Sequence, residues 1–545
     1  KPKTLHAETP VSPLGPAGQF ATSIYGGFFG AGMGIMVVAV LGLTAAPVWA
    51  TAATPPERIV DMGLAELRIA LDQGRITSAE LVGAYLERIA TVDQPAGGVH
   101  AVLAVNGKAM EQARAWDTRR AQQGAGQPGA PLAGIPFLAK DNFDAIGLPN
   151  TGGSLALANS MPASNAFVIQ KLLDQGAILL GKTNLSELAA FYGWYGYSSV
   201  GGLTLNPFNA LRTADGSSSG SAAAVAAKLA PFALGTDTTG SIRSPASVTG
   251  TVGMRSTMGL VSRSGVIPMS LTADAVGAIT RSVEDQAILL AAIQGEDKSD
   301  ASTKGITRPQ SPLASGLSGS TLAGKVIAVV DNFDGANPEV DVIKRNAIAV
   351  MQKAGARVIN IRLPKAFETL QPSVLGPIGV AEFKPQFEAY LAGLPAGQPK
   401  DLREFMSRLD TLTDKGTRTI NPGRYKGLIE NLETRATDSP EYIQLLSVVI
   451  PSLKRELTGL MEAGRYDALF YPTIGCTAPV EPGKTDPGFL CKSYAYAAAK
   501  IASTTGFPEV TVNGGKAAGN IPVGVSFLAK AGNDAKMLEL AAAFE

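Results

Sequence analysis

Residues 205–266 constrain the fold most, because two glycine- and hydroxyl-rich segments in this stretch flank a run of helix-forming residues. The two segments are residues 215–221 and 235–243. They predict loops, since ordering glycine costs much backbone entropy and serine hydroxyls compete for backbone hydrogen bonds. Between them, residues 222–229 predict a helix and residues 232–234 a short buried strand. This order is typical of a site that presents hydroxyls and backbone N–H groups to a substrate.

The whole chain has the composition of a globular α/β protein. Of its 545 residues, 45% are hydrophobic and 17% are charged,. Strand and helix patterns alternate along most of the chain, whereas residues 366–465 are mainly helical. We therefore predict one large domain over residues 57–545, with a mixed, mostly parallel β-sheet covered by helices on both faces. The helical stretch is expected to form an insertion or cap on that domain.

Net charge and histidine content argue against two classes of function. The formal net charge is +1, whereas proteins that bind nucleic acid use a basic face to replace its counterions. The two histidines are His6, in the N-terminal stretch, and His100, in a predicted turn. A Ser-His-Asp hydrolase needs a positioned imidazole, and neither histidine suits that role. We predict no nucleic-acid partner, and a nucleophile that works without histidine.

Two short motifs match known sites but stand in the wrong context. Residues 176–183 fit the phosphate-binding pattern G-x-x-x-x-G-K-[ST]. Their middle four residues are themselves a predicted strand, whereas a phosphate loop needs them as free backbone between a strand and a helix. Residues 216–220 fit the G-x-S-x-G nucleophile elbow with Ser218 as nucleophile, but the histidine that must follow it is missing,. We expect neither ATP binding nor this histidine-dependent hydrolase.

Cys476 and Cys491 are the only cysteines and lie 15 residues apart. Two cysteines do not make a four-ligand zinc site, and with so few histidines we predict no metal. They either form a disulfide, which would suit an oxidising compartment, or remain as two buried thiols. The sequence leaves both alternatives open.

Residues 1–56 have the features of a leader. Residues 9–56 contain no charged side chain, and residues 28–48 are an apolar run followed by a Val-x-Ala pattern that ends at Ala50. A basic start, an apolar centre and small residues before the cleavage point are typical of a secretory signal peptide. A membrane anchor is the alternative, because about 21 apolar residues can span a bilayer. We favour cleavage, so that the protein is exported to the periplasm or secreted, without stable membrane insertion.

Residues 135–142 predict a short apolar strand that carries Lys140 near its end. A buried lysine is costly unless it is paired or uncharged. Such a position suits either an ordinary lysine at a strand end or a functional amine with a lowered pKa.

Five segments carry a resemblance to a known family. They are residues 134–142, 181–184, 216–221, 235–243 and 261–268. Together they resemble the amidase signature family, and the similarity extends over roughly residues 56–544. Within that family, residues 217–219 and 181–187 look most like the exported bacterial peptide-amidase branch. The resemblance implies the amidase signature α/β fold and amide hydrolysis.

The resemblance implies a catalytic triad of Lys140, Ser217 and Ser241. In this triad Ser241 attacks the amide carbonyl, Ser217 passes the proton on, and Lys140 accepts it as a neutral amine. The two serines are 24 residues apart, as in the family pattern. The family also has a cis peptide bond before the bridging serine, here between Gly216 and Ser217. A lowered pKa of Lys140, which this role demands, agrees with a place at the end of a buried strand.

The resemblance also implies an oxyanion hole between two charged residues. The expected donors are the backbone N–H groups of Thr238, Thr239, Gly240 and Ser241. Asp237 and Arg243 flank them and are expected to shape the loop as a structural pair. Asp215, Ser219 and Thr239 stand where the family often has glycine, and Thr239 would be strained if its φ were positive.

The predicted function is hydrolysis of a carboxamide to a carboxylic acid plus an amine or ammonia, without a cofactor. The substrate is a small-molecule or peptide amide of unspecified structure, and the oligomeric state is unspecified too. One alternative is an amidotransferase subunit that acts on misacylated tRNA, which would need ATP-dependent partner subunits and a cytoplasmic location. The leader argues against it. The other is a catalytically silent binding protein of the same fold, against which the retained triad argues.

Overall fold

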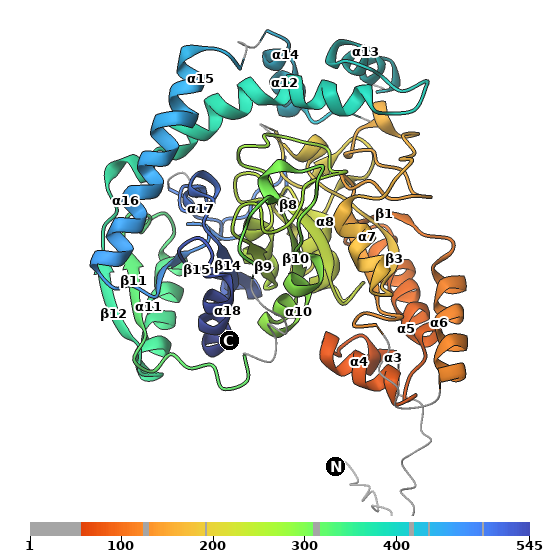
Figure 1. Cartoon of the computed structure of the whole chain (residues 1–545), viewed down its shortest axis with the longest axis horizontal. Coiled ribbons are helices and arrows are strands. Elements are labelled where there is room, and N and C mark those ends of the chain that lie inside the picture. Colours follow the sequence, from red (N-terminus) through yellow and green to blue (C-terminus); the bar gives the residue numbers. More distant parts are fainter. Residues whose placement is uncertain are drawn as a thin grey trace, which may run out of the picture. The chain divides into compact units, whose positions relative to one another are not determined.

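An eleven-stranded sheet forms the centre of the structure, a computed structural model (Figure 1). The structure describes residues 56–545, except 124–129, 191–192, 309–316, 414–418, 434–436 and 493–494. The predicted leader therefore lies outside the described residues, apart from its last position. Among the residues that are described, no helix combines the length and the apolar character needed to cross a membrane.

The strands follow one another across the sheet in an order that differs from their order in the chain. From one edge to the other they are β1 (Val102–Val105), β3 (Ile178–Thr183), β2 (Pro136–Lys140), β8 (Ala233–Asp237), β10 (Ala275–Thr280), β9 (Val252–Arg255), β14 (Glu509–Ala517), β15 (Ile521–Leu528), β13 (Ala468–Pro472), β11 (Val326–Val330) and β12 (Arg357–Ile361). Two short hairpins, β4 (Tyr197–Ser198) with β5 (Gly202–Leu203) and β6 (Leu205–Asn206) with β7 (Asn209–Thr213), stand apart from it.

Parallel pairing is concentrated toward the two flanks of the sheet. β2 is parallel to β3 and β8 on one side, and β11 is parallel to β12 and β13 on the other. Across the middle, from β8 through β10, β9, β14 and β15 to β13, every pairing is antiparallel. The mixed α/β sheet is as predicted, and its antiparallel centre is larger than we expected, because β9 from the middle of the chain pairs there with β14 near its C-terminal end.

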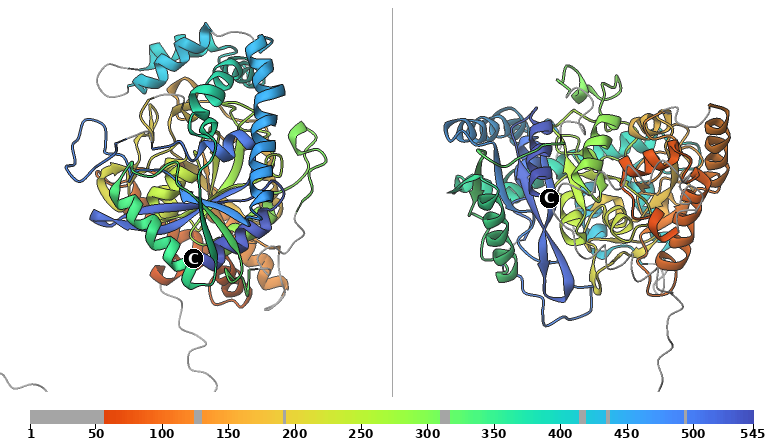
Figure 2. Two further views of the ribbon diagram at one scale, coloured as in Figure 1. Left: turned by 90° about the vertical axis from the view of Figure 1, so that its left-hand side faces the viewer. Right: turned by 90° about the horizontal axis from the view of Figure 1, so that it is seen from below.

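Helices cover both faces of the sheet, as Figure 2 shows from two further directions. On the core they are α3 (Pro56–Ile59), α4 (Leu64–Asp72), α5 (Ser78–Arg88), α6 (Ala109–Gln123), α7 (Phe167–Asp174), α8 (Ser219–Ala226), α9 (Arg243–Thr249), α10 (Val283–Ile293), α11 (Pro338–Lys353), α17 (Lys500–Thr505) and α18 (Asp534–Phe544). The main apolar core joins residues from most of these helices to the strands, whereas α17 packs with alternate residues of β11 and β13 in a second apolar cluster.

The stretch predicted as a helical insertion is helical in the structure. Its helices are α12 (Gly376–Ala392), α13 (Leu402–Leu412), α14 (Pro422–Leu432), α15 (Pro440–Gln444) and α16 (Ile450–Ala463). In Figure 1 they form a band along the top and left of the sheet. Glu382 of α12 ties this band to the core, because its carboxylate accepts a hydrogen bond from Ser270 Oγ at 2.6 Å. Within the band, Tyr442 Oη of α15 donates to the same carboxylate at 2.7 Å.

Candidate active site

Lys140 lies at the end of β2, where the neighbouring parallel strand β8 brings a hydroxyl next to it. The side chain is completely buried. Its Nζ donates hydrogen bonds to Ser217 Oγ at 2.7 Å and to Thr236 Oγ1 at 2.7 Å. Asn142 Nδ2 donates to the same Thr236 hydroxyl at 3.1 Å. Lys140 is therefore linked directly to Ser217, and Thr236 is a partner that the sequence did not lead us to expect.

Burial controls the charge of this lysine. It lowers the pKa of Lys140 to about 7, although the negative charges of Asp237 and Asp274 act in the opposite direction. An amine with such a pKa is neutral in part of the molecules at neutral pH, and a neutral amine can accept a proton.

Residues 215–218, which we call the Ser217 loop, hold Ser217 against this amine. The peptide bond between Gly216 and Ser217 is cis, as the family resemblance implied. The Ser217 carbonyl accepts the backbone N–H of Ser186 at 3.0 Å. The neighbouring Ser218 has a different role, since its hydroxyl donates to the Thr236 carbonyl at 3.1 Å and it is fully buried.

Residues 237–243, which we call the Ser241 loop, connect β8 to α9. Its carbonyl at Ser241 accepts the N–H of Ser218 at 3.0 Å, so the two loops are in direct contact. Ser241 is half-buried, whereas Ser217 and Ser218 are buried. Among these three serines, Ser241 is thus the most exposed.

The backbone of the Ser241 loop turns around the carboxylate of Asp237. That carboxylate accepts the N–H of Gly240 at 2.9 Å and the N–H of Ile242 at 3.1 Å. The positive φ in the loop falls on Gly240, at 117°, so the strain considered for Thr239 does not arise. The resemblance implied the Gly240 N–H as one of four oxyanion donors, and in the structure this N–H is bonded to Asp237.

Thr238 is positioned by a second carboxylate. Its Oγ1 donates to Asp274 Oδ1 at 2.6 Å, and the other oxygen of Asp274 accepts the N–H groups of Met269 at 2.8 Å and Ser270 at 3.0 Å. Ser270 also donates to Glu382 of the helical insertion. The carboxylate of Asp274 therefore connects the start of the Ser241 loop to that insertion through Ser270.

A buried cluster of charges anchors the Ser241 loop to the central strands. Arg243 donates two hydrogen bonds to Asp237, both at 3.0 Å, and one to Glu509 of β14 at 2.6 Å. Arg255 of β9 lies 3.2 Å from the same Asp237 carboxylate. Burial acts to raise the pKa of Asp237, but Arg243 and Arg255 together lower it well below its usual range. Asp237 and Arg243 therefore form the structural pair that was expected.

Asp215, at a position where the resemblance implied glycine, takes a left-handed backbone conformation. Its φ is +60°, a left-handed conformation that Asp tolerates better than most residues. Its carboxylate accepts the N–H of Gly216 at 2.8 Å, and burial raises its pKa to about 7. The substitution is thus accommodated within the Ser217 loop.

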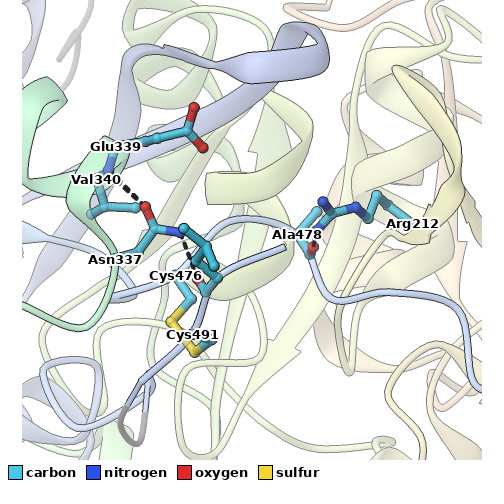
Figure 3. Close-up of a disulfide and its surroundings, with 8 residues drawn as sticks. Arg212, Asn337, Glu339, Val340, Cys476, Ala478 and Cys491 are labelled. Carbon is cyan, nitrogen blue, oxygen red and sulfur yellow. Dashed lines mark hydrogen bonds between the residues drawn. A yellow bond between two sulfur atoms is a disulfide. The ribbon is translucent and has the colours of Figure 1, made fainter. Parts of the chain in front are cut away.

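Cys476 and Cys491 form a disulfide, so the bonded alternative holds (Figure 3). The segment between them contacts β7, because Arg212 Nη1 donates to the Ala478 carbonyl at 2.7 Å. β7 leads directly into the Ser217 loop. Among the residues described, no group of three or more His, Cys, Asp or Glu side chains is placed to hold a metal ion.

Comparisons with known proteins identify relatives over most of the chain. The model of the family described as Amidase matches residues 80–538. The chain is 35% identical over 500 residues to a glutamyl-tRNA(Gln) amidotransferase subunit of Salinispora arenicola, covering 89% of this chain and 97% of that protein. It is 31% identical over 501 residues to the mandelamide hydrolase of Pseudomonas putida, covering 89% of this chain and 91% of that protein. The structure also resembles the X-ray structure of peptide amidase from Stenotrophomonas maltophilia, with a TM-score of 0.79 and 33% sequence identity. The match covers 89% of this chain and 96% of that chain.

Proposed function

The chain belongs to the amidase family and is an amide-hydrolysing enzyme, and from this premise we propose that Ser241 forms an acyl-enzyme while Ser217 and Lys140 relay the proton. The contact between Lys140 and Ser217, next to the loop that carries Ser241, is the observation that supports this proposal. The completely buried Lys140 shares a 2.7 Å hydrogen bond with Ser217, and the half-buried Ser241 lies on the loop that touches Ser217's neighbour.

The proposed reaction has two stages, formation of the acyl-enzyme and its hydrolysis. Ser241 Oγ attacks the carbonyl carbon of the amide, and its proton passes through the Ser217 hydroxyl to the neutral amine of Lys140. The negative charge that develops on the carbonyl oxygen is stabilised by the N–H groups of Thr238, Thr239 and Ser241. When the C–N bond breaks, the proton returns along the same path to the leaving amine. Water then hydrolyses the ester on Ser241 by the same relay.

Activity is expected to rise with pH through about 7. Burial lowers the pKa of Lys140 to about 7, and only the neutral form can accept the proton from Ser217. Below this pH the lysine is protonated and the relay is blocked, and above it the relay is open. A profile of kcat/KM from about pH 5 to 9 should show an acidic limb with an apparent pKa near 7. A rate that stays level or falls over this range would contradict the role of Lys140.

The substrate proposed is a carboxamide of a peptide or small molecule, hydrolysed by this chain alone. The likeness to a peptide amidase and to a mandelamide hydrolase supports this substrate class. The test incubates the purified chain with a peptide amide, an aryl amide and glutamine, and measures ammonia without ATP or other proteins. Ammonia from one of the first two amides supports the proposal. If ammonia is released from glutamine and from neither of the first two amides, the amidotransferase alternative replaces it.

We propose further that the protein is exported. The apolar run of residues 28–48, with its Val-x-Ala ending at Ala50, and the disulfide support this location, since disulfides persist in oxidising compartments,. Intact-mass analysis of the protein from its producing cells should find a chain that begins at Thr51, outside the cytoplasm, and lighter by two hydrogens than the reduced form. A cytoplasmic chain that retains residues 28–48 and has two alkylatable thiols would overturn the proposal.

A further inference from the structure

A second buried lysine contacts the Ser241 loop from the other side. Lys500 is the first residue of α17 and is 3% exposed. Its Nζ donates a short hydrogen bond to the carbonyl oxygen of Thr239. No sequence motif marks this lysine, and it lies about 260 residues from the loop that it contacts.

α17 and the residue before it pack directly on the Ser241 loop at three positions. Besides the Lys500 contact, Ser503 Oγ accepts a hydrogen bond from Arg243 at 3.0 Å. A Cβ placed on Gly240 would lie 3.0 Å from the Cβ of Ala499, the residue that precedes the helix. The loop and α17 therefore fit against each other with little free space.

The position of Lys500 is energetically unfavourable for an ammonium group. Burial lowers its pKa to about 7 and the positive charge of Arg243 lowers it too, whereas Asp237 and Asp215 act to raise it. The ring of Tyr496, whose centre lies 5.7 Å from Nζ, favours the ammonium form and offsets part of this effect,. A buried lysine makes the folded protein less stable than an apolar side chain at the same place would. A lysine at this position therefore needs a reason other than stability, and its hydrogen bond to Thr239 indicates one.

The peptide unit between Thr239 and Gly240 is held at both ends. Lys500 binds its carbonyl oxygen, and Asp237 binds its N–H at 2.9 Å. Gly240 has a φ of 117°, and glycine allows this peptide plane to rotate more freely than another residue would. The N–H groups of Thr239 and Ser241 lie in the two adjacent peptide planes, so a fixed central plane restricts the backbone rotations that would turn them.

We propose that Lys500 is a positioning residue, which fixes the Thr239–Gly240 peptide so that the adjacent N–H groups face the oxyanion. The inference rests on the proposed Ser241 mechanism and adds to it a residue that touches neither substrate nor nucleophile. Fixed hydrogen-bond donors stabilise the transition state without reorganisation, and a displacement of about 1 Å can cost about 100-fold in rate. The ground-state contacts of the substrate are unaffected by this role.

The test compares three variants of the full chain with the unaltered enzyme. Lys500→Met removes the donor while keeping the length and apolar stem, and should lower kcat by about 10- to 100-fold with KM within about 3-fold. Lys500→Arg restores a cationic donor and should recover most of kcat. Lys454→Met is the matched control, because Lys454 lies near Gly506 at the other end of α17, and it should leave kcat unchanged. Melting temperatures establish that each variant is folded.

The rate at which a fluorophosphonate modifies Ser241 gives a second readout, since this reaction also places negative charge in the oxyanion site. It should fall in Lys500→Met by a factor similar to that of kcat. A folded Lys500→Met enzyme with kcat within about 2-fold of the unaltered one, or with a change in KM alone, would overturn the inference while leaving the proposed function intact. No fluorophosphonate adduct on Ser241 in the unaltered chain would overturn both.

Discussion

Replacing Ser241 by alanine is expected to lower kcat by roughly 10⁴- to 10⁶-fold, the range found when a catalytic serine nucleophile or its partners are removed. The half-buried Ser241 is the proposed attacking group, and without its oxygen no acyl-enzyme can form. KM should change little, because ground-state binding does not require this hydroxyl. Steady-state kinetics on the amide found in the substrate panel measure both parameters.

Ser218→Ala is the matched control for this prediction. Ser218 is one of the three consecutive serines and occupies the nucleophile position of the G-x-S-x-G pattern, yet its hydroxyl donates to the Thr236 carbonyl. Its loss should reduce kcat far less than the loss of Ser241. A Ser218→Ala enzyme as inactive as Ser241→Ala, with an unchanged melting temperature, would contradict the assignment of the nucleophile.

Removing Arg243 is expected to have the largest effect on stability, about 3–5 kcal/mol, the usual cost of breaking a buried ion pair from one side. Arg243→Met would leave Asp237 and Glu509 buried, and Glu509 would lose its 2.6 Å bond to the guanidinium. Urea unfolding of the full chain measures the loss. The Ser241 loop should also lose its shape, so kcat should fall in the variant even where it is folded.

A surface ion pair provides the comparison for Arg243. Lys536 pairs with Asp467, and 43% of the Lys536 side chain is exposed. Exposed pairs contribute about 0–1 kcal/mol, so Lys536→Met should lower the unfolding free energy by no more than that. If Arg243→Met cost no more than Lys536→Met, the buried cluster would not anchor the loop.

Much of the site was predictable because its residues lie in short local patterns. The loops around Ser217 and Ser241, the helix between them and Lys140 at a strand end all depend on neighbours in the chain, and the structure has α8, β8 and β2 in these places. The helix begins earlier than predicted, at Ser219, where the Gly220 N–H and the Ser221 hydroxyl find tertiary partners in the carbonyls of Asn184 and Leu234.

The remaining features depend on contacts that sequence patterns do not report. The antiparallel centre exists because β9 pairs with β14, where Arg255 lies opposite Glu509, some 250 residues later. The same distant pairing brings Glu509 to Arg243, and α17 brings Lys500 to Thr239. The hydrogen bond from the Gly240 N–H to Asp237 could not be predicted from the sequence either, because it depends on how the loop turns around the Asp237 carboxylate.

The most direct test of the Ser241 mechanism is to label the purified, folded chain with a serine-directed fluorophosphonate and to locate the adduct by mass spectrometry, with Lys140→Met treated in parallel. The proposed relay predicts one adduct on Ser241 that forms at a much lower rate in Lys140→Met, because Lys140 Nζ is bonded to Ser217 at 2.7 Å. No adduct on the folded chain, or an adduct on Ser218 that forms equally well in Lys140→Met, would contradict the mechanism.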